Sequence, residues 1–241
     1  MFRNIIVSAF GAALIVCVAV TALQFFTTEP LILHAEAFEV SAVAADTSAA
    51  PNPTTADIHV HDDGTQHVQN GEPWAPAKGI ERAAYTALAN LVLGFAASLM
   101  LLGMMLLRSE AIDARRGLLW GAAAFVGVSL LPALGLPPEL PGTPAADIFE
   151  RQIWWFGAAA ASGGGIALLV FSRNWGLMAA GVVLLIAPHV IGAPAPPSHA
   201  VPYPGALAGE FVVASLVVSA LLWSLAGLSA GALYQRLSRS T

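Results

Sequence analysis

Residues 84–107 read AYTALANLVLGFAASLMLLGMMLL and contain no Asp, Glu, Lys, Arg or His. About 20 helical residues, at a rise of about 1.5 Å each, cross the hydrocarbon core of a bilayer, which is about 30 Å thick. The run is continuously apolar rather than alternating, so it predicts a transmembrane helix and not a barrel strand. This stretch therefore places the chain among the helical membrane proteins.

Five further runs of the same kind predict five further spans. The sequence is 57% hydrophobic and only 10% charged, which leaves too few ionisable groups to cover a soluble globule. We expect an all-α integral membrane protein, a six-helix transmembrane bundle that forms a single domain over residues 1–241. The fifth run is the shortest of the six. The predicted spans lie near residues 5–26, 84–107, 117–136, 153–171, 175–192 and 206–233.

The first run has an alternative interpretation. Arg3 followed by an apolar run that reaches residues 20–22 is similar to a secretory signal peptide with its cleavage site. The apolar run continues beyond that point to Phe26. This continuation favours a span over a cleaved signal.

The arginines predict the orientation of the helices. With the N-terminus in the cytoplasm, most of the ten basic residues lie inside and every short loop obeys the positive-inside rule. All of the fifteen acids except Glu110 and Asp113, and all six histidines, then lie at the outer side. We expect an inner (plasma) membrane protein with both termini cytoplasmic, in contact with lipid and not with nucleic acid. The inner basic residues are Arg3, Arg108, Arg115, Arg116, Arg173, Arg236 and Arg239.

Small residues recur at four-residue spacing in three of the runs, which predicts close contacts between helices. The run of glycines at 163–165 weakens a helix and indicates a hinge or a narrow path. Asn90, in the middle of the second run, is expected to bond a neighbouring helix. The small-residue positions are Gly117 and Gly121, then Gly157, Ala161 and Gly165, then Gly227 and Gly231.

Residues 27–81 form the one long extracytoplasmic loop expected in the chain. The loop is acidic, contains histidines and has a single lysine, Lys78. Its stretch 41–57, SAVAADTSAAPNPTTAD, has no periodic apolar face. This composition predicts a flexible linker.

Histidines and carboxylates gather within this loop in DIHVHDDGTQH, residues 57–67. A His-x-His pair in an extended segment places both rings on one face, and imidazole with carboxylate suits divalent first-row metals. A weak, exchangeable capture site is one interpretation. The other is a solvated loop, because polar loops accumulate the same residues. The candidate ligands are His59, His61, Asp62, Asp63 and His67, with Asp57 beside them.

A second group of candidate ligands lies closer to the membrane. His34, Glu36 and Glu39 follow the first span, and His189 lies at the outer end of the fifth. Ionisable residues in or beside a span are costly to bury, which makes each a functional candidate. For His189 the alternative is an interfacial histidine that bonds a backbone carbonyl.

Missing motifs exclude several classes of function. The only lysine, Lys78, is followed by glycine, so there is no Walker A motif. No zincin HExxH and no serine elbow is present. His189 is alone in its membrane region, whereas a b-type haem site needs paired histidines. The single cysteine, Cys17, allows neither a disulfide framework nor a thiolate metal site within one chain.

Five segments together resemble CbtA, a family of predicted cobalt transporter subunits. The resemblance implies a multi-helix inner-membrane protein that is not an enzyme and takes up cobalt for cobalamin synthesis. It implies a small single-span, histidine-containing partner protein (CbtB-like) and no tightly bound cofactor besides the transported divalent ion. The segments are PLILHAEAFE (30–39), GIERAAYTALANLVLGFA (79–96), RGLLWGAAAF (116–125), PALGLPPELPGTPAADIFERQIWW (132–155) and APHVIGAP (187–194).

The resemblance matches several of these candidate ligands to elements of the family. Family members often have adjacent histidines in the first loop, whereas this chain has His-x-His and one later histidine, so we expect a single site. The expected route runs from the acidic outer face through the capture segment, and then by His34, Glu36 and His189 to a path between helices. A nickel or zinc importer, and a non-transporting membrane metal sensor or assembly factor, remain alternatives. The positions matched are His59, His61, His67, Pro188, His189, Glu36 and Glu39.

Overall fold

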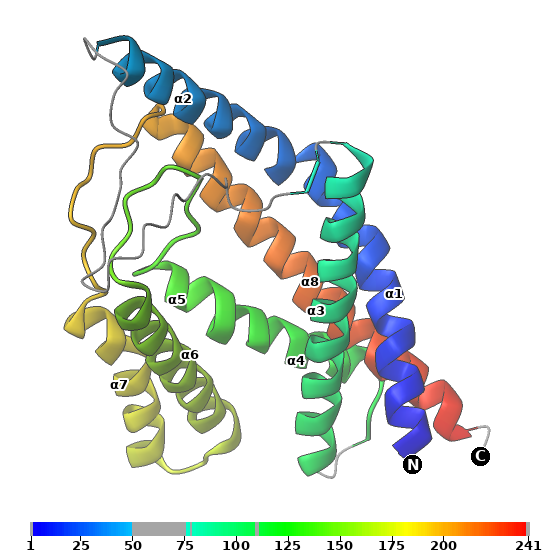
Figure 1. Ribbon diagram of the computed structural model, residues 1–241. Coiled ribbons are helices and arrows are strands. Elements are labelled where there is room, and N and C mark those ends of the chain that lie inside the picture. Colours follow the sequence, from blue (N-terminus) through cyan, green and yellow to red (C-terminus); the bar gives the residue numbers. More distant parts are fainter. Residues whose placement is uncertain (1, 50–75, 78, 109–110, 240–241) are drawn as a thin grey trace, which may run out of the picture.

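The computed structural model describes residues 2–49, 76–77, 79–108 and 111–239 (Figure 1). Within these ranges all regular structure is helical, which confirms the predicted all-α class. The elements are α1 (Phe2–Phe26), α2 (Thr28–Ala49), α3 (Ile80–Leu107), α4 (Ala114–Ala124), the π-helix η1 (Phe125–Leu130), α5 (Leu131–Ala133), α6 (Ile148–Phe171), α7 (Trp175–Ile191) and α8 (Gly205–Arg239).

Five segments of the described chain are long and apolar enough to span a membrane: α1, α3, the continuous α4–η1–α5, α6 and α8. The fifth predicted run, 175–192, forms α7, an apolar helix of 17 residues. At about 1.5 Å per residue it is about 26 Å long, slightly less than a hydrocarbon core. All six predicted runs are therefore apolar helices of a membrane bundle. The run predicted to be the shortest, 175–192, forms the shortest of these six helical segments.

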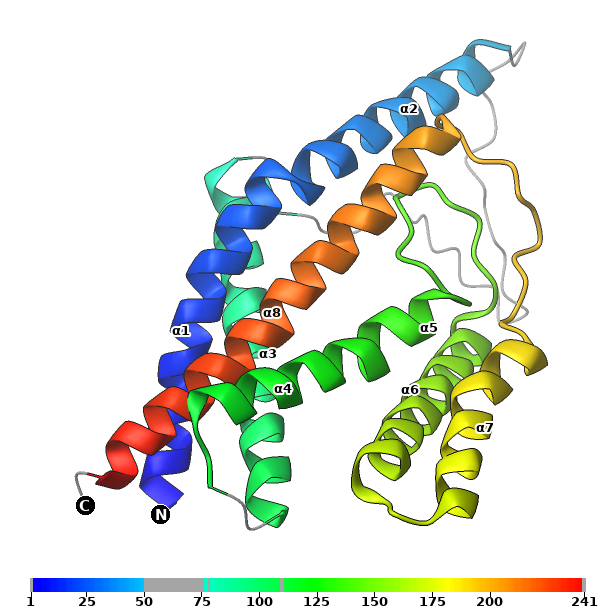
Figure 2. The same ribbon diagram turned by 180° about the vertical axis from the view of Figure 1, so that it is seen from behind.

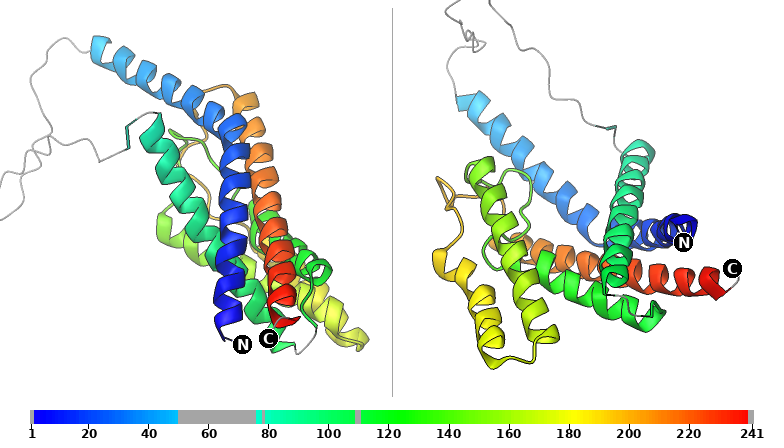
Figure 3. Two further views of the ribbon diagram at one scale, coloured as in Figure 1. Left: turned by 90° about the vertical axis from the view of Figure 1, so that its right-hand side faces the viewer. Right: turned by 90° about the horizontal axis from the view of Figure 1, so that it is seen from below.

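The core of the bundle surrounds α1. Figure 3 shows α1 between α3 and α8, and α4 packs against the opposite side of α8 (Figure 1). Val16 and Val20 of α1 are fully buried, as is Leu101 of α3. Helices α6 and α7 form a hairpin that contacts the rest of the bundle mainly through η1 and α5, with a smaller contact to α4. The hairpin leaves two cavities at its junction with the main bundle, one near each end.

Glycines make the closest contact between helices. A Cβ added to Gly117 would overlap the carbonyl of Gly227, and one added to Gly121 would overlap the carbonyl of Trp223. Gly165 of α6 approaches Gly181 of α7 in the same way. The predicted small-residue contacts are confirmed at these positions. The prediction is wrong for Gly157, which has no atom within 4 Å of its added Cβ.

At residues 163–165, where a hinge or a narrow path was predicted, α6 runs through the three glycines without interruption. The irregular turn lies instead in η1, where the N–H of Leu131 donates to the carbonyl of Val126, five residues back. Pro132, the next residue, has no N–H to donate to a carbonyl in that turn. Trp223 of α8 supports this segment through a 3.1 Å hydrogen bond from Nε1 to Ser129 Oγ.

The flexible linker predicted to begin at residue 41 is wrong over its first residues, which belong to helix α2. The helix continues to Ala49, and residues 50–57 of the expected linker lie outside the described residues. The stretch 41–49 is rich in alanine and has neither Gly nor Pro, so nothing in it ends a helix. Figure 2 shows α2 bending away from the end of α1 and running alongside the N-terminal part of α8.

Both termini lie at the same end of the bundle. Asn4 Nδ2 of α1 donates to the carbonyl of Leu237 in α8 at 3.4 Å. The first and last described helices therefore begin and end close together. We call this the inner end and the end that carries α2 the outer end.

Candidate functional site

The connections α5–α6 and α7–α8 enclose a cavity of about 310 Å³ at the outer end. Its wall includes the start of α8, and α2 packs next to it through Ala35, which is buried with Leu140, Tyr203 and Phe211. We call this cavity the outer chamber. Its polar lining residues are Glu139, Thr143, Arg151, Ser198, His199 and Tyr203.

Polar contacts hold the two connections of the outer chamber in place. Arg151 Nη2 of α6 binds Glu139 Oε2 at 2.6 Å. Thr143 shares a hydrogen bond with the hydroxyl of Tyr203 and donates to the carbonyl of Leu140 at 2.6 Å. The first connection is thereby joined both to α6 and to the segment before α8. Prolines in both connections add rigidity because their φ angles are fixed.

The outer chamber by itself offers few ligands to a cation. The carboxylate of Glu139 is neutralised by Arg151, and His199 is exposed. The hydroxyls of Thr143 and Tyr203 are engaged with each other. Such a set suits a hydrated passage better than a complete coordination sphere, which for a divalent ion draws on several imidazoles or carboxylates.

Glu36 of α2 has a cationic partner of its own. Arg82 at the start of α3 binds both carboxylate oxygens, with Nη2–Oε1 2.7 Å and Nη1–Oε2 3.3 Å. This bidentate geometry is typical of strong charge-assisted hydrogen bonds. His34 lies two residues earlier, is exposed and places its ring 5.2 Å from that of Phe38. Glu39 follows on the same helix.

His189 lies in the last turn of α7 against Trp154 of α6, with the ring centroids 6.2 Å apart and the rings nearly edge to face. The Nε2 atom of His189 is buried and has no hydrogen-bond partner among the described residues, and the same holds for Nε1 of Trp154. Its Nε2 therefore does not make the carbonyl bond that the interfacial alternative predicted. Buried polar atoms are normally satisfied, so His189 stays a candidate ligand.

The candidate ligands near the membrane do not converge. In the part of the chain that the structure describes, no three His, Cys, Asp or Glu side chains are placed to hold a metal ion. His34 and Glu36 lie on α2 and His189 on α7, and Figures 1 and 2 show the two helices apart with the loops of the outer chamber between them. The capture segment is outside the described residues, with His59, His61, Asp62, Asp63 and His67.

The family model for the probable cobalt transporter subunit CbtA matches residues 2–235. This chain belongs to the CbtA family. The match runs from the start of α1 to within a few residues of the end of α8. Among curated proteins and among solved structures, no match was found. The predicted resemblance is thus confirmed, and the chain is a transporter-family subunit located in a membrane.

Several residues of this CbtA subunit that shape the outer end were not identified from sequence. Thr143, His199 and Tyr203 are isolated polar residues in proline-rich connections, and only their meeting in space gives them a role. The signal available was the repeated proline in both connections. The prediction for Asn90 is confirmed, since its Nδ2 donates to Thr21 Oγ1 at 2.9 Å and to Gln24 Oε1 at 2.6 Å across the α1–α3 contact.

Proposed function

We propose that this CbtA chain is the membrane subunit of a cobalt importer that serves cobalamin synthesis. The observation that carries the proposal is the family match over residues 2–235, nearly the whole chain. The chain performs no covalent chemistry and works with a small single-span, histidine-containing subunit. It lies in the inner (plasma) membrane with both termini in the cytoplasm, which accords with the cluster of arginines at the inner end.

Capture is the first step of the proposed uptake. Segment 57–67 supplies His59, His61 and nearby carboxylates, and it is tethered at the outer end because α2 precedes it and α3 follows it. The surrounding acids raise the local cation concentration. Imidazole and carboxylate hold cobalt loosely enough for release, as a site that feeds a pathway requires.

Passage from the outer chamber toward α7 is the second step. The outer chamber is an opening beside α6 with polar residues in its wall, and His189 Nε2 is a buried nitrogen with no other described partner. A dehydrated cation gains a ligand there without displacing an existing hydrogen bond. Glu36 has a different role in this scheme: with Arg82 it fastens α2 to α3.

Uptake of radiolabelled cobalt tests the proposal, in cells that lack other cobalt importers and express this chain with and without its small partner. Nickel and zinc serve as competitors. Saturable uptake that cobalt inhibits best is the expected result. Stronger inhibition by nickel or zinc would reassign the ion. Cobalt binding without uptake, with both proteins present in the membrane, would replace the importer with the sensor or assembly factor.

A further inference from the structure

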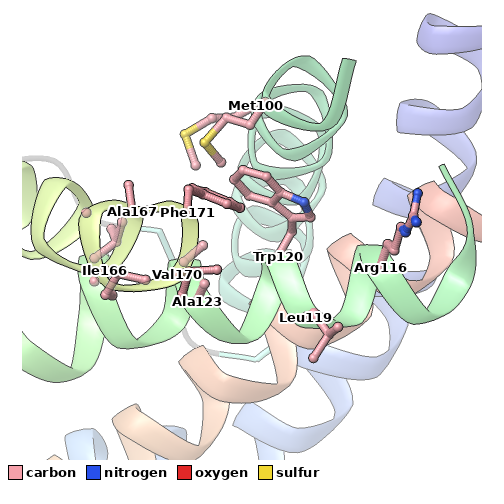
Figure 4. Close-up of a pocket in the computed structure, with 14 residues that line it drawn as sticks. Met100, Arg116, Leu119, Trp120, Ala123, Ile166, Ala167, Val170 and Phe171 are labelled. Carbon is pink, nitrogen blue, oxygen red and sulfur yellow. The ribbon is translucent and has the colours of Figure 1, made fainter. Parts of the chain in front are cut away.

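A second cavity, of about 550 Å³, lies toward the inner end between α3, α4–η1 and α6. We call it the inner groove. In Figure 4, Trp120 of α4 and Phe171 of α6 lie together next to Met100 of α3. Among the described residues that line the groove, Arg116 is the one charged side chain. An apolar cavity of this kind does not provide a route for a hydrated cation, so it has a purpose separate from the proposed uptake path.

The inner groove opens towards the bilayer. Met100, Leu119 and Val170 on its rim are 42%, 61% and 65% exposed. Gly163 in its wall faces open space, because an added Cβ would meet no atom within 4 Å. Within spanning helices such a space is filled by apolar matter, either an acyl chain or a second helix.

The depth of the groove fits one leaflet. Its lining on α6 extends from Phe171 at the inner end to Gly163. At about 1.5 Å per helical residue this is about 12 Å, which is less than half of a hydrocarbon core of about 30 Å. A lipid whose headgroup lies at the inner end would therefore place one chain along the groove.

The positive charge of two arginines at the inner groove favours an anionic lipid as its occupant. Arg116 lines the groove, and the guanidinium of Arg108 lies 4.0 Å from the ring centroid of Phe171, which forms part of the wall. The guanidinium of Arg116 also donates to the carbonyl of Ala111 at 2.8 Å, which keeps it at this end. Basic pockets between spanning helices on the cytoplasmic side bind anionic headgroups. An apolar helix would fill the groove without meeting these arginines.

We propose that the inner groove binds an anionic phospholipid from the leaflet at the inner end. One acyl chain lies along Trp120, Gly163 and Phe171, and the phosphate binds at Arg116 and Arg108. The lipid joins the α6–α7 hairpin to α3 and α4 where protein contacts between them are sparse. This binding does not depend on cobalt transport.

Native mass spectrometry of the purified chain tests the proposal, with phosphatidylglycerol and phosphatidylcholine supplied at equal concentration. We expect the wild type to retain phosphatidylglycerol in preference by roughly fivefold, the effect of about one interfacial charge. Replacing both Arg108 and Arg116 by Gln should abolish the preference, and Gly163→Leu should reduce binding of both lipids by filling the groove. Gly157→Leu, at an open glycine of the same helix, and Arg173→Gln, at an exposed arginine outside the groove, should behave as the wild type.

Equal retention of the two lipids by the wild type would overturn the proposal. The proposal would also be overturned if the Gly163→Leu variant elutes as a folded, monodisperse protein and binds phosphatidylglycerol as the wild type does. If that variant does not fold, Ala123→Leu, on the α4 wall of the groove, provides the same test. A second polypeptide that copurifies with the wild type and is lost from Gly163→Leu, with lipid content unchanged, would assign the groove to a transmembrane helix instead.

Discussion

Arg82 at the start of α3 holds both carboxylate oxygens of Glu36 in α2, with the shorter Nη2–Oε1 distance 2.7 Å. The two residues are 46 positions apart, and the segment between them contains the proposed capture histidines. The ion pair therefore joins the two ends of that segment at the outer end of the bundle. A carboxylate expected to receive the metal ion is already occupied by a guanidinium.

Glu36→Gln and Arg82→Gln should have the same small effect. The two side chains are 28% and 24% exposed, so the ion pair stabilises the fold by about 1 kcal/mol or less. In a double-mutant cycle the second substitution should add little to the first. Thermal unfolding in detergent and cobalt uptake per folded molecule provide the measurements. If Glu36→Gln lost much more uptake than Arg82→Gln, Glu36 would be a ligand of the ion after all.

His189→Phe should reduce cobalt uptake by roughly tenfold or more, since loss of even an outer-shell partner of a metal ligand has an effect of this size. Stability should be unchanged, because Nε2 has no described hydrogen bond to lose and Phe preserves the edge contact with Trp154. Trp154→Phe is the matched control: it removes the other buried nitrogen without a described partner and should preserve uptake. Normal uptake by His189→Phe would remove His189 from the route.

Replacing both His59 and His61 by Ala should weaken uptake at limiting cobalt and leave the maximal rate nearly unchanged. The reason is that a capture site raises occupancy at low concentration and does not set the rate of passage. Concentration-dependent uptake gives both parameters. The control replaces Gln66 and Gln69 in the same segment by Ala, which preserves its charge and its histidines. Unchanged uptake at limiting cobalt in the histidine variant would exclude capture by this pair.

Gly117→Ala should destabilise the bundle by roughly 1–3 kcal/mol or more, because the added Cβ overlaps the carbonyl of Gly227 in a contact between two backbones. Gly157→Ala is the matched control on α6, where the added Cβ meets open space. It should be neutral or stabilising by up to about 1 kcal/mol, since alanine favours helix. Thermal unfolding compares the two. Equal melting temperatures for the two variants would show that the close contact between α4 and α8 at Gly117 contributes little to stability.

Much of the fold was predictable because the bilayer imposes its requirement on each spanning segment separately. A span requires about 20 apolar residues that satisfy their own backbone hydrogen bonds, and this condition is visible in one stretch of sequence at a time. The contacts at Gly117 and Gly227 were also visible, as a spacing. Helix α2 was not, since its polar and alanine-rich composition is compatible with both a helix and a linker. In the structure, Ala35 of α2 is buried against Tyr203 and Phe211, a tertiary contact that the sequence does not reveal.

The sequence by itself determined that the chain is a helical membrane protein of the CbtA family, and it predicted that the histidines and most of the acids lie towards one end. Only the tertiary structure decided that Glu36 binds Arg82, that Thr143 meets Tyr203 and that His189 Nε2 is buried without a described partner. The hydrophobicity of a span is a sum over residues that are adjacent in the sequence, so it can be read from the sequence alone. The charge state and the ligands available to a side chain depend on groups brought close from distant positions, and packing of the helices selects those groups.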